Sequence, residues 1–209
     1  MSSPEERDER DAYIAKLEAE LNKRPRVGVL PPVAAIGLIA SLALAFTMRD
    51  DVSYFFSSRE PIELGAEGDY HFERAAPNRY AQLHGVPTAK GWYVEEADGA
   101  FVVVGVNDTP VAVRRVTFED ENKRLSDGKR PQPRQNPFFA RGRLLNREQA
   151  EKYEEALREY ETWSGGRVQW LLLAETPPGK DLKTVGMFSG LLLFALVNLW
   201  LLKRGLTRR

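Results

Sequence analysis

The sequence predicts a two-span membrane protein, with one spanning helix near each end and an extracytoplasmic α+β, mainly-β domain between them. Two long apolar runs without charged residues, at 27–48 and 185–202, predict the helices. Short runs rich in β-branched and aromatic residues, separated by turn residues, predict strands within the region 49–184. A small OB-like barrel that carries one amphipathic helix is an architecture that fits this order.

The leader, residues 1–26, predicts a cytoplasmic amphipathic helix. Ile14, Leu17 and Leu21 recur at helical spacing, and a serine at position 2 or 3 can begin the helix. Isolated helices shorter than about 12–15 residues are marginal in water. We therefore expect these three side chains to contact a partner chain or a second copy, unless the helix is stabilised by continuity with the first span.

The first apolar run, residues 27–48, would reach about 33 Å as a helix, enough to cross a hydrocarbon core of about 30 Å. Residues 43–45 (Ala-Leu-Ala) also fit the pattern of a signal-peptide cleavage site. The apolar run is longer than that of a typical signal peptide, and the charged leader before it is long. Both features favour a retained signal anchor over a cleaved signal peptide.

Small residues at helical spacing occur in both apolar runs. Gly186 and Gly190 form a G-x-x-x-G pattern in the second run, 185–202, and Gly37 and Ser41 form a related pair in the first. Such residues let two helices approach closely. These four positions predict helix packing in the membrane, either within one molecule or between molecules.

Basic residues flank the outer end of each run, and they predict that both termini are cytoplasmic. They are Lys23, Arg24 and Arg26 before the first run, and Lys203, Arg204, Arg208 and Arg209 after the second. Residues 49–184 then lie in the periplasm, and the basic tail 203–209 favours anionic lipid headgroups. The expected location is the bacterial inner (cytoplasmic) membrane, and the absence of cysteine fits a domain in an oxidising space.

Six runs between the apolar segments predict strands, at 80–86, 91–94, 100–106, 111–116, 138–145 and 167–174. The run 100–106 is continuous and β-branched, so it predicts a strand that is buried on both faces. Residues 107–110 (Asn-Asp-Thr-Pro) predict a turn, which would join this strand to the next as a hairpin.

Two further segments separate the strands. Residues 119–137 carry many charges, several prolines and no apolar periodicity, so they predict an exposed, mobile loop. Its basic residues are interpreted as solvated, with docking of an acidic partner as the alternative: Lys123, Arg124, Lys129, Arg130 and Arg134. Residues 147–164 predict an amphipathic helix, with Asn146 and Gln149 in a capping-box-like pair before it and Gly165 at its end.

The composition argues against several classes of function. Thirty Lys and Arg balance 30 Asp and Glu, whereas nucleic-acid-binding proteins usually carry a basic excess. The chain has no cysteine, which excludes thiol nucleophiles, disulfides and iron–sulfur clusters. It has only two histidines, so a histidine-based metal site would need carboxylates to complete it. None of the common catalytic or nucleotide-binding motifs occurs. We therefore expect no enzyme activity, no cofactor and no metal site.

The order of elements is similar to that of the Surf family of cytochrome oxidase assembly factors, which also have an apolar helix at each end of a β-rich domain. Residues 83–86 (LHGV) and 141–144 (RGRL) are the segments that carry the likeness. The resemblance implies an accessory role in the assembly of a membrane complex, and it assigns no site residue.

Taken together, these patterns predict a non-enzymatic accessory or assembly protein whose periplasmic domain binds another envelope protein. Expected partners are the lipid bilayer and a membrane or periplasmic protein, or a second copy of the chain. The alternative is a membrane-anchored sensor that holds a small apolar ligand or lipid. In that case Trp92, Phe101 and Trp170 would line a cavity rather than fill the core. An unrecognised hydrolase is a third, minor hypothesis.

Overall fold

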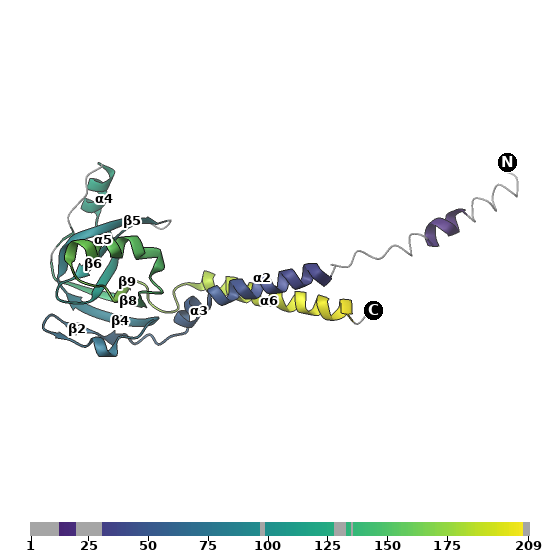
Figure 1. The fold of residues 1–209 in the computed structure, drawn as a ribbon, viewed down its shortest axis with the longest axis horizontal. Helices are drawn as coiled ribbons and strands as arrows, with labels where there is room; N and C mark the ends of the chain where they lie inside the picture. The colour runs from purple at the N-terminus through teal and green to yellow at the C-terminus, as the bar shows by residue number, and fades with distance from the viewer. Residues whose placement is uncertain (1–12, 20–30, 97–98, 128–132, 135, 207–209) are drawn as a thin grey trace. The chain divides into compact units, whose positions relative to one another are not determined.

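The computed structural model describes residues 13–19, 31–96, 99–127, 133–134 and 136–206. The chain divides into two compact units, one of residues 1–46 with 189–209 and the other of residues 47–188. In the described residues the first unit is helical, and the second is a sheet with helices on it (Figure 1).

Two apolar helices correspond to the predicted spans. α2 (Pro31–Thr47) covers most of the first run, whose residues 27–30 lie outside the described ranges, and α6 (Leu182–Leu206) extends the second run at both ends. Among the described residues, α6 is the one helix that is by itself long and apolar enough to cross a membrane. α2 passes the same test only together with α3 (Arg49–Phe55), and the two are bent by 51°. Crossing of the membrane by both helices therefore stays a prediction.

The sheet domain is mostly β, as predicted, and it contains more strands than the sequence pattern indicated. The seven-stranded sheet has the order β1-β4-β8-β9-β7-β6-β5. Its strands are β1 (Ile62–Glu63), β4 (Arg79–Gly85), β5 (Pro87–Glu96), β6 (Gly99–Val106), β7 (Val111–Val116), β8 (Phe138–Asn146) and β9 (Trp170–Ala174). The pairs β1·β4 and β7·β9 are parallel and the others antiparallel, so the sheet is mixed. β6 and β7 form the predicted hairpin.

Apolar side chains pack on both faces of this sheet. The sheet core consists of Leu64, Ala81, Leu83, Val102, Val104, Val106, Val111, Val113, Ala140, Leu144 and Leu172. The helix core, between the sheet and α5 (Glu154–Ser164), consists of Val103, Ala112, Leu145, Ala150, Tyr153, Ala156, Leu157, Val168 and Leu171. Because alternate β6 residues enter different cores, the prediction of a strand buried on both faces is confirmed.

The predicted helix 147–164 forms in part. Asn146 and Gln149 make the reciprocal capping bonds, in which the Gln149 N–H donates to Asn146 Oδ1 at 2.9 Å and the Asn146 N–H to Gln149 Oε1 at 3.4 Å. A turn and a 3-10 segment (Glu151–Tyr153) follow before α5 begins at Glu154. Gly165 ends the helix with a φ of 70°, a left-handed conformation that glycine adopts without a steric penalty.

Two segments outside the predicted strands and helices contain regular structure. Residues 119–126 of the predicted loop 119–137 form α4 (Glu119–Ser126), whereas 128–132 and 135 lie outside the described residues. Glu121 explains this helix, because its carboxylate accepts two bonds from Arg115 and one from the Phe118 N–H. The region 49–79 likewise contains α3, β1, the hairpin of β2 (Gly65–Ala66) with β3 (Asp69–Tyr70), and a 3-10 turn (Phe72–Arg74).

Candidate functional site

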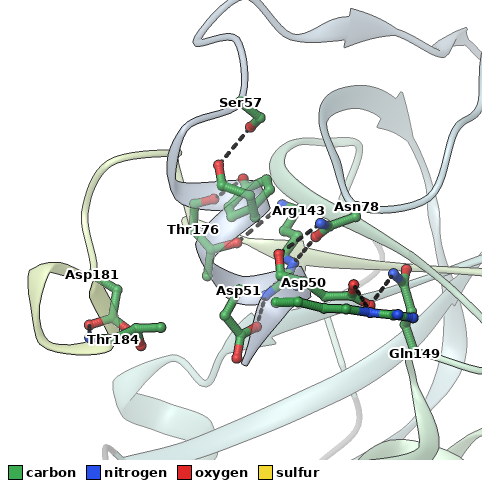
Figure 2. A network of polar contacts seen from close by, with 11 residues as sticks. Asp50, Asp51, Ser57, Asn78, Arg143, Gln149, Thr176, Asp181 and Thr184 are labelled. Carbon is green, nitrogen blue, oxygen red and sulfur yellow. Dashed lines mark hydrogen bonds and ion pairs between the residues drawn. The ribbon is translucent and has the colours of Figure 1, made fainter. Parts of the chain in front are cut away.

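A network of polar contacts joins the chain where it enters the sheet domain to the chain where it leaves (Figure 2). We call this network the linker clamp and define it as Asp50, Asp51, Tyr54, Asn78, Arg143, Gln149 and Thr176. All of its members belong to the unit of residues 47–188. The entering segment is α3, and the leaving segment is the stretch between β9 and α6.

Arg143 is the central member of the linker clamp. It lies on β8 next to Leu144, which is in the sheet core, so alternation along the strand turns Arg143 away from that core. Its Nε donates to Asn78 Oδ1 at 2.7 Å and its Nη1 to Asp51 Oδ1 at 2.6 Å. The guanidinium carbon also lies 4.9 Å from the ring centroid of Tyr54. The Arg143 side chain is 15% exposed and that of Asp51 is 52% exposed, so the ion pair is partly shielded from water.

Asn78 also links α3 to the sheet, through hydrogen bonds to Asp50 and Leu144. Its Nδ2 donates to the carbonyl oxygen of Asp50 at 2.8 Å, and its backbone N–H donates to that of Leu144 at 2.7 Å. Its φ of 60° places it in the left-handed region, which asparagine tolerates better than most residues. The Asp50 carboxylate in turn accepts from Gln149 Nε2 at 3.1 Å.

Thr176 brings the leaving segment into the same network. Its carbonyl oxygen accepts from the Tyr54 hydroxyl at 2.5 Å. Its own hydroxyl accepts from the Arg143 backbone N–H at 3.1 Å and donates to the Leu173 carbonyl at 2.6 Å. Tyr54 is buried, so this aromatic residue packs on the domain. Both linkers are therefore bound to β8 and its surroundings.

The start of α6 is fixed separately by Asp181, which directly precedes the helix (Figure 2). Its carboxylate accepts from the Thr184 hydroxyl at 2.5 Å and from the Thr184 N–H at 3.3 Å. These bonds lower the pKa of Asp181, since they favour its charged form. This is an ordinary N-cap, and it begins the helix shortly after the linker clamp ends.

Chemically, the linker clamp positions chain segments. The side-chain charges of Asp51 and Arg143 meet one another, and the Asp50 carboxylate accepts from the Gln149 amide and lies 3.4 Å from Arg49 Nε. Among the described residues, no group of three or more His, Cys, Asp or Glu side chains is placed to hold a metal ion. The arrangement therefore offers hydrogen bonds and an ion pair that hold two linkers together.

The structure separates the four small residues predicted to pack helices. A Cβ atom at Gly37 would lie 2.8 Å from Asn198 Oδ1, and Ser41 is buried on the same face of α2. Gly186 and Gly190 are exposed, and no described atom lies within 4 Å of a Cβ placed at either. Gly37 thus faces α6, whereas packing through Gly186 and Gly190, within one molecule or between molecules, stays a prediction.

Two of the three leader residues can be located. Ile14 and Leu17 belong to a helical stretch at 13–19, and both side chains are exposed. Leu21 lies outside the described residues. The predicted cytoplasmic contact through Ile14, Leu17 and Leu21 stays a prediction.

The three aromatic residues named for a core or a cavity lie in different environments. Trp92 packs against the helix core and Trp170 against the sheet core, which are on opposite faces of the sheet. Phe101 is buried, and the Arg114 guanidinium carbon lies 3.5 Å from its ring centroid. This separation does not support one cavity lined by all three.

Sequence reasoning missed the linker clamp because its partners are distant along the chain. Asp51 and Arg143 are 92 positions apart, and Asp50 and Gln149 are 99 positions apart. The available signals were the pair Asp50-Asp51 directly after the first run and the Pro77-Asn78 turn before β4. Neither signal identifies a partner.

No protein-family model, curated protein or solved structure matches this chain.

Proposed function

We propose that the protein is a two-span accessory or assembly protein of the bacterial inner membrane, and that its periplasmic domain binds another envelope protein. α2 and α6 provide the spans, with both termini cytoplasmic. Both helices are apolar, and basic residues lie in the last turn of α6. An OB-like barrel remains the architecture that we expect for the domain.

The observation that carries this proposal is the bond from Tyr54 to Thr176, which joins the two linkers. A domain tethered by two independent flexible linkers would sample many orientations. Here the entering and leaving segments are both bound to β8, so the two ends of the domain are held together at one place. A domain that presents one surface to a partner benefits when its two ends are held together, because preorganisation of the domain lowers the entropic cost of binding.

Placement of the aromatic residues favours this function over the alternative of an apolar-ligand sensor. A sensor would need an enclosed apolar cavity, and the sequence nominated Trp92, Phe101 and Trp170 to line it. Trp92 and Trp170 instead pack against separate cores. The described domain therefore supports filled cores and binding at the surface.

The test is affinity purification of the tagged, full-length protein from cross-linked membranes, followed by mass spectrometry. We expect a membrane or periplasmic protein to be recovered in a constant ratio. The same ratio should fall for Arg143→Met, which breaks the linker clamp, at equal amounts of purified chain. Arg158→Met is the matched control, because the Arg158 side chain is 74% exposed and outside the linker clamp. Recovery of the chain alone or only with itself would contradict the proposal.

A further inference from the structure

A hollow of about 670 Å³ lies at the C-terminal end of α5, in the sheet domain. One wall is the β6–β7 turn, residues 107–110, and the other consists of the last turns of α5 with residues 166–168. This volume is in the range of small-molecule sites. The linker clamp contributes no residue to it.

An exposed indole forms part of the wall. Trp163 is 42% exposed, although it is a large aromatic residue on an amphipathic helix. Its ring lies 5.9 Å from that of Tyr160, and Lys90 Nζ lies 4.9 Å from its centroid. Lys90 is not among the residues that line the hollow.

The position of Tyr160 depends on Gly105 of β6, which has no side chain. A Cβ atom at Gly105 of β6 would overlap the phenol of Tyr160. The phenol therefore lies directly on the strand backbone, which only glycine permits at this distance. This contact seats the end of α5 beside the β6–β7 turn and keeps the two walls together.

Polar side chains with hydrogen-bonding capacity surround the indole. Asn107 and Asp108 come from the turn and Arg167 from the opposite wall, and all three are exposed. Asp108 has a φ of 60°, a left-handed conformation that aspartate adopts more readily than most residues. The wall thus combines an amide, a carboxylate and a guanidinium, with one negative and one positive charge.

We propose that this hollow binds a neutral sugar ring of a glycan. A pyranose presents an apolar C–H face, which packs on an indole, and a rim of hydroxyls that both donate and accept hydrogen bonds. Trp163 supplies the platform, Asp108 accepts from hydroxyls, and Arg167 and the Asn107 amide donate to them. The balanced charge of the wall favours a neutral sugar over an acidic one. This site is independent of the proposed protein partner.

The test is a titration of the full-length protein with neutral oligosaccharides built from glucose, galactose or N-acetylglucosamine. The protein is kept in a detergent without a sugar headgroup, because glycosidic detergents would compete. Saturation-transfer NMR detects the bound sugar and, titrated against sugar concentration, measures affinity for the wild type and the variants alike. We expect saturation transfer to at least one sugar, and a binding constant weakened about tenfold or more by Trp163→Ala.

Asp108→Gly provides a second variant that should fold normally, since glycine adopts a φ of 60° without strain. It should weaken binding as well, with an unchanged melting temperature. Tyr13→Ala is the control, because Tyr13 is an exposed aromatic residue outside the hollow, and it should bind like the wild type. Absence of saturation transfer for every neutral sugar, or binding that survives both hollow variants, would overturn the proposal.

Discussion

The hydroxyl of Tyr54 donates a hydrogen bond to the carbonyl oxygen of Thr176, although the two residues are 122 positions apart. Tyr54 belongs to the segment that enters the sheet domain, and Thr176 to the segment that leaves it. Thr176 also accepts a bond from the Arg143 backbone, so both segments meet at β8. The domain therefore begins and ends at one place on its own surface.

Removal of this hydroxyl should destabilise the domain. Tyr54→Phe keeps the ring against Arg143 but leaves the Thr176 carbonyl without its tyrosine donor, which should cost about 1–2 kcal/mol of unfolding free energy. Denaturant unfolding of the full chain in micelles, followed by tryptophan fluorescence, measures this loss.

Tyr70→Phe is a matched control for that experiment. The Tyr70 hydroxyl is buried and has no hydrogen-bond partner in the described part of the chain. Its removal should therefore leave the stability unchanged or slightly raise it. Equal losses for Tyr54→Phe and Tyr70→Phe would show that the bond to Thr176 is not what matters at position 54.

The ion pair of Asp51 with Arg143 should show energetic coupling. Asp51→Ala and Arg143→Met each break the same 2.6 Å contact, so the double variant should lose less than the sum of the single losses. Because Asp51 is half exposed, we expect a coupling energy of only about 0.5–1.5 kcal/mol. The exposed pair of Glu154 with Arg158, at 3.6 Å, is the reference and should couple more weakly. Additive losses at Asp51 and Arg143 would contradict this account of the linker clamp.

Lowering the pH should reduce the stability of the folded domain, because Glu96 becomes protonated. Burial alone would raise the pKa of Glu96, but hydrogen bonds from Tyr153, Lys152 and Arg114 outweigh it and lower the pKa. The unfolded chain therefore binds this proton more readily than the folded chain does. The resulting stability is present above the ordinary glutamate pKa and is lost as the pH falls through the lowered value.

Glu96→Gln tests this pH dependence. It should flatten the fall in melting temperature on the acidic side. At neutral pH it should also cost about 3 kcal/mol, because it leaves the buried Arg114 without its anion. Glu95→Gln is the neighbouring control and should keep the wild-type profile, since Glu95 is exposed. An unchanged acid limb in Glu96→Gln would contradict the assignment.

Gly37 should be intolerant of a side chain, whereas Gly190 should tolerate one. Gly37→Leu drives its Cβ into Asn198 on α6, but Gly190→Leu meets no described atom within 4 Å. Gly37→Leu should therefore lower the midpoint of unfolding in sodium dodecyl sulfate, measured by circular dichroism, and Gly190→Leu should not. The reverse order would mean that α6 packs on α2 through the other face. A change of oligomeric state in Gly190→Leu would support its predicted contact between molecules.

Local patterns in the sequence predicted much of the sheet, but not the contacts that complete it. β7 begins and ends where its β-branched run predicted, at Val111 and Val116, because this pattern depends only on neighbours in the chain. α4 was missed because its helix depends on Glu121, whose buried carboxylate is paired with Arg115 rather than solvated. Charge content alone does not distinguish these two states.

The candidate site was still less accessible to sequence reasoning. Asp50 and Asp51 come shortly after the first apolar run in the sequence, and only the folded chain brings Arg143 and Gln149 to them. The small residues show the same limit. Helical spacing predicted helix packing at Gly186 and Gly37 alike, and only the structure shows that Gly37 packs against Asn198.

The most direct test of the account is the topology of the sheet domain in the membrane. The chain has no native cysteine, so single cysteines at Ser3, Asp108 and Thr207 report on one position each. In intact cells whose outer membrane has been permeabilised, a membrane-impermeant maleimide should label Asp108→Cys. It should label Ser3→Cys and Thr207→Cys only after the inner membrane is opened. Labelling of either terminus in intact cells, or protection of Asp108→Cys, would contradict two spans with a periplasmic domain between them.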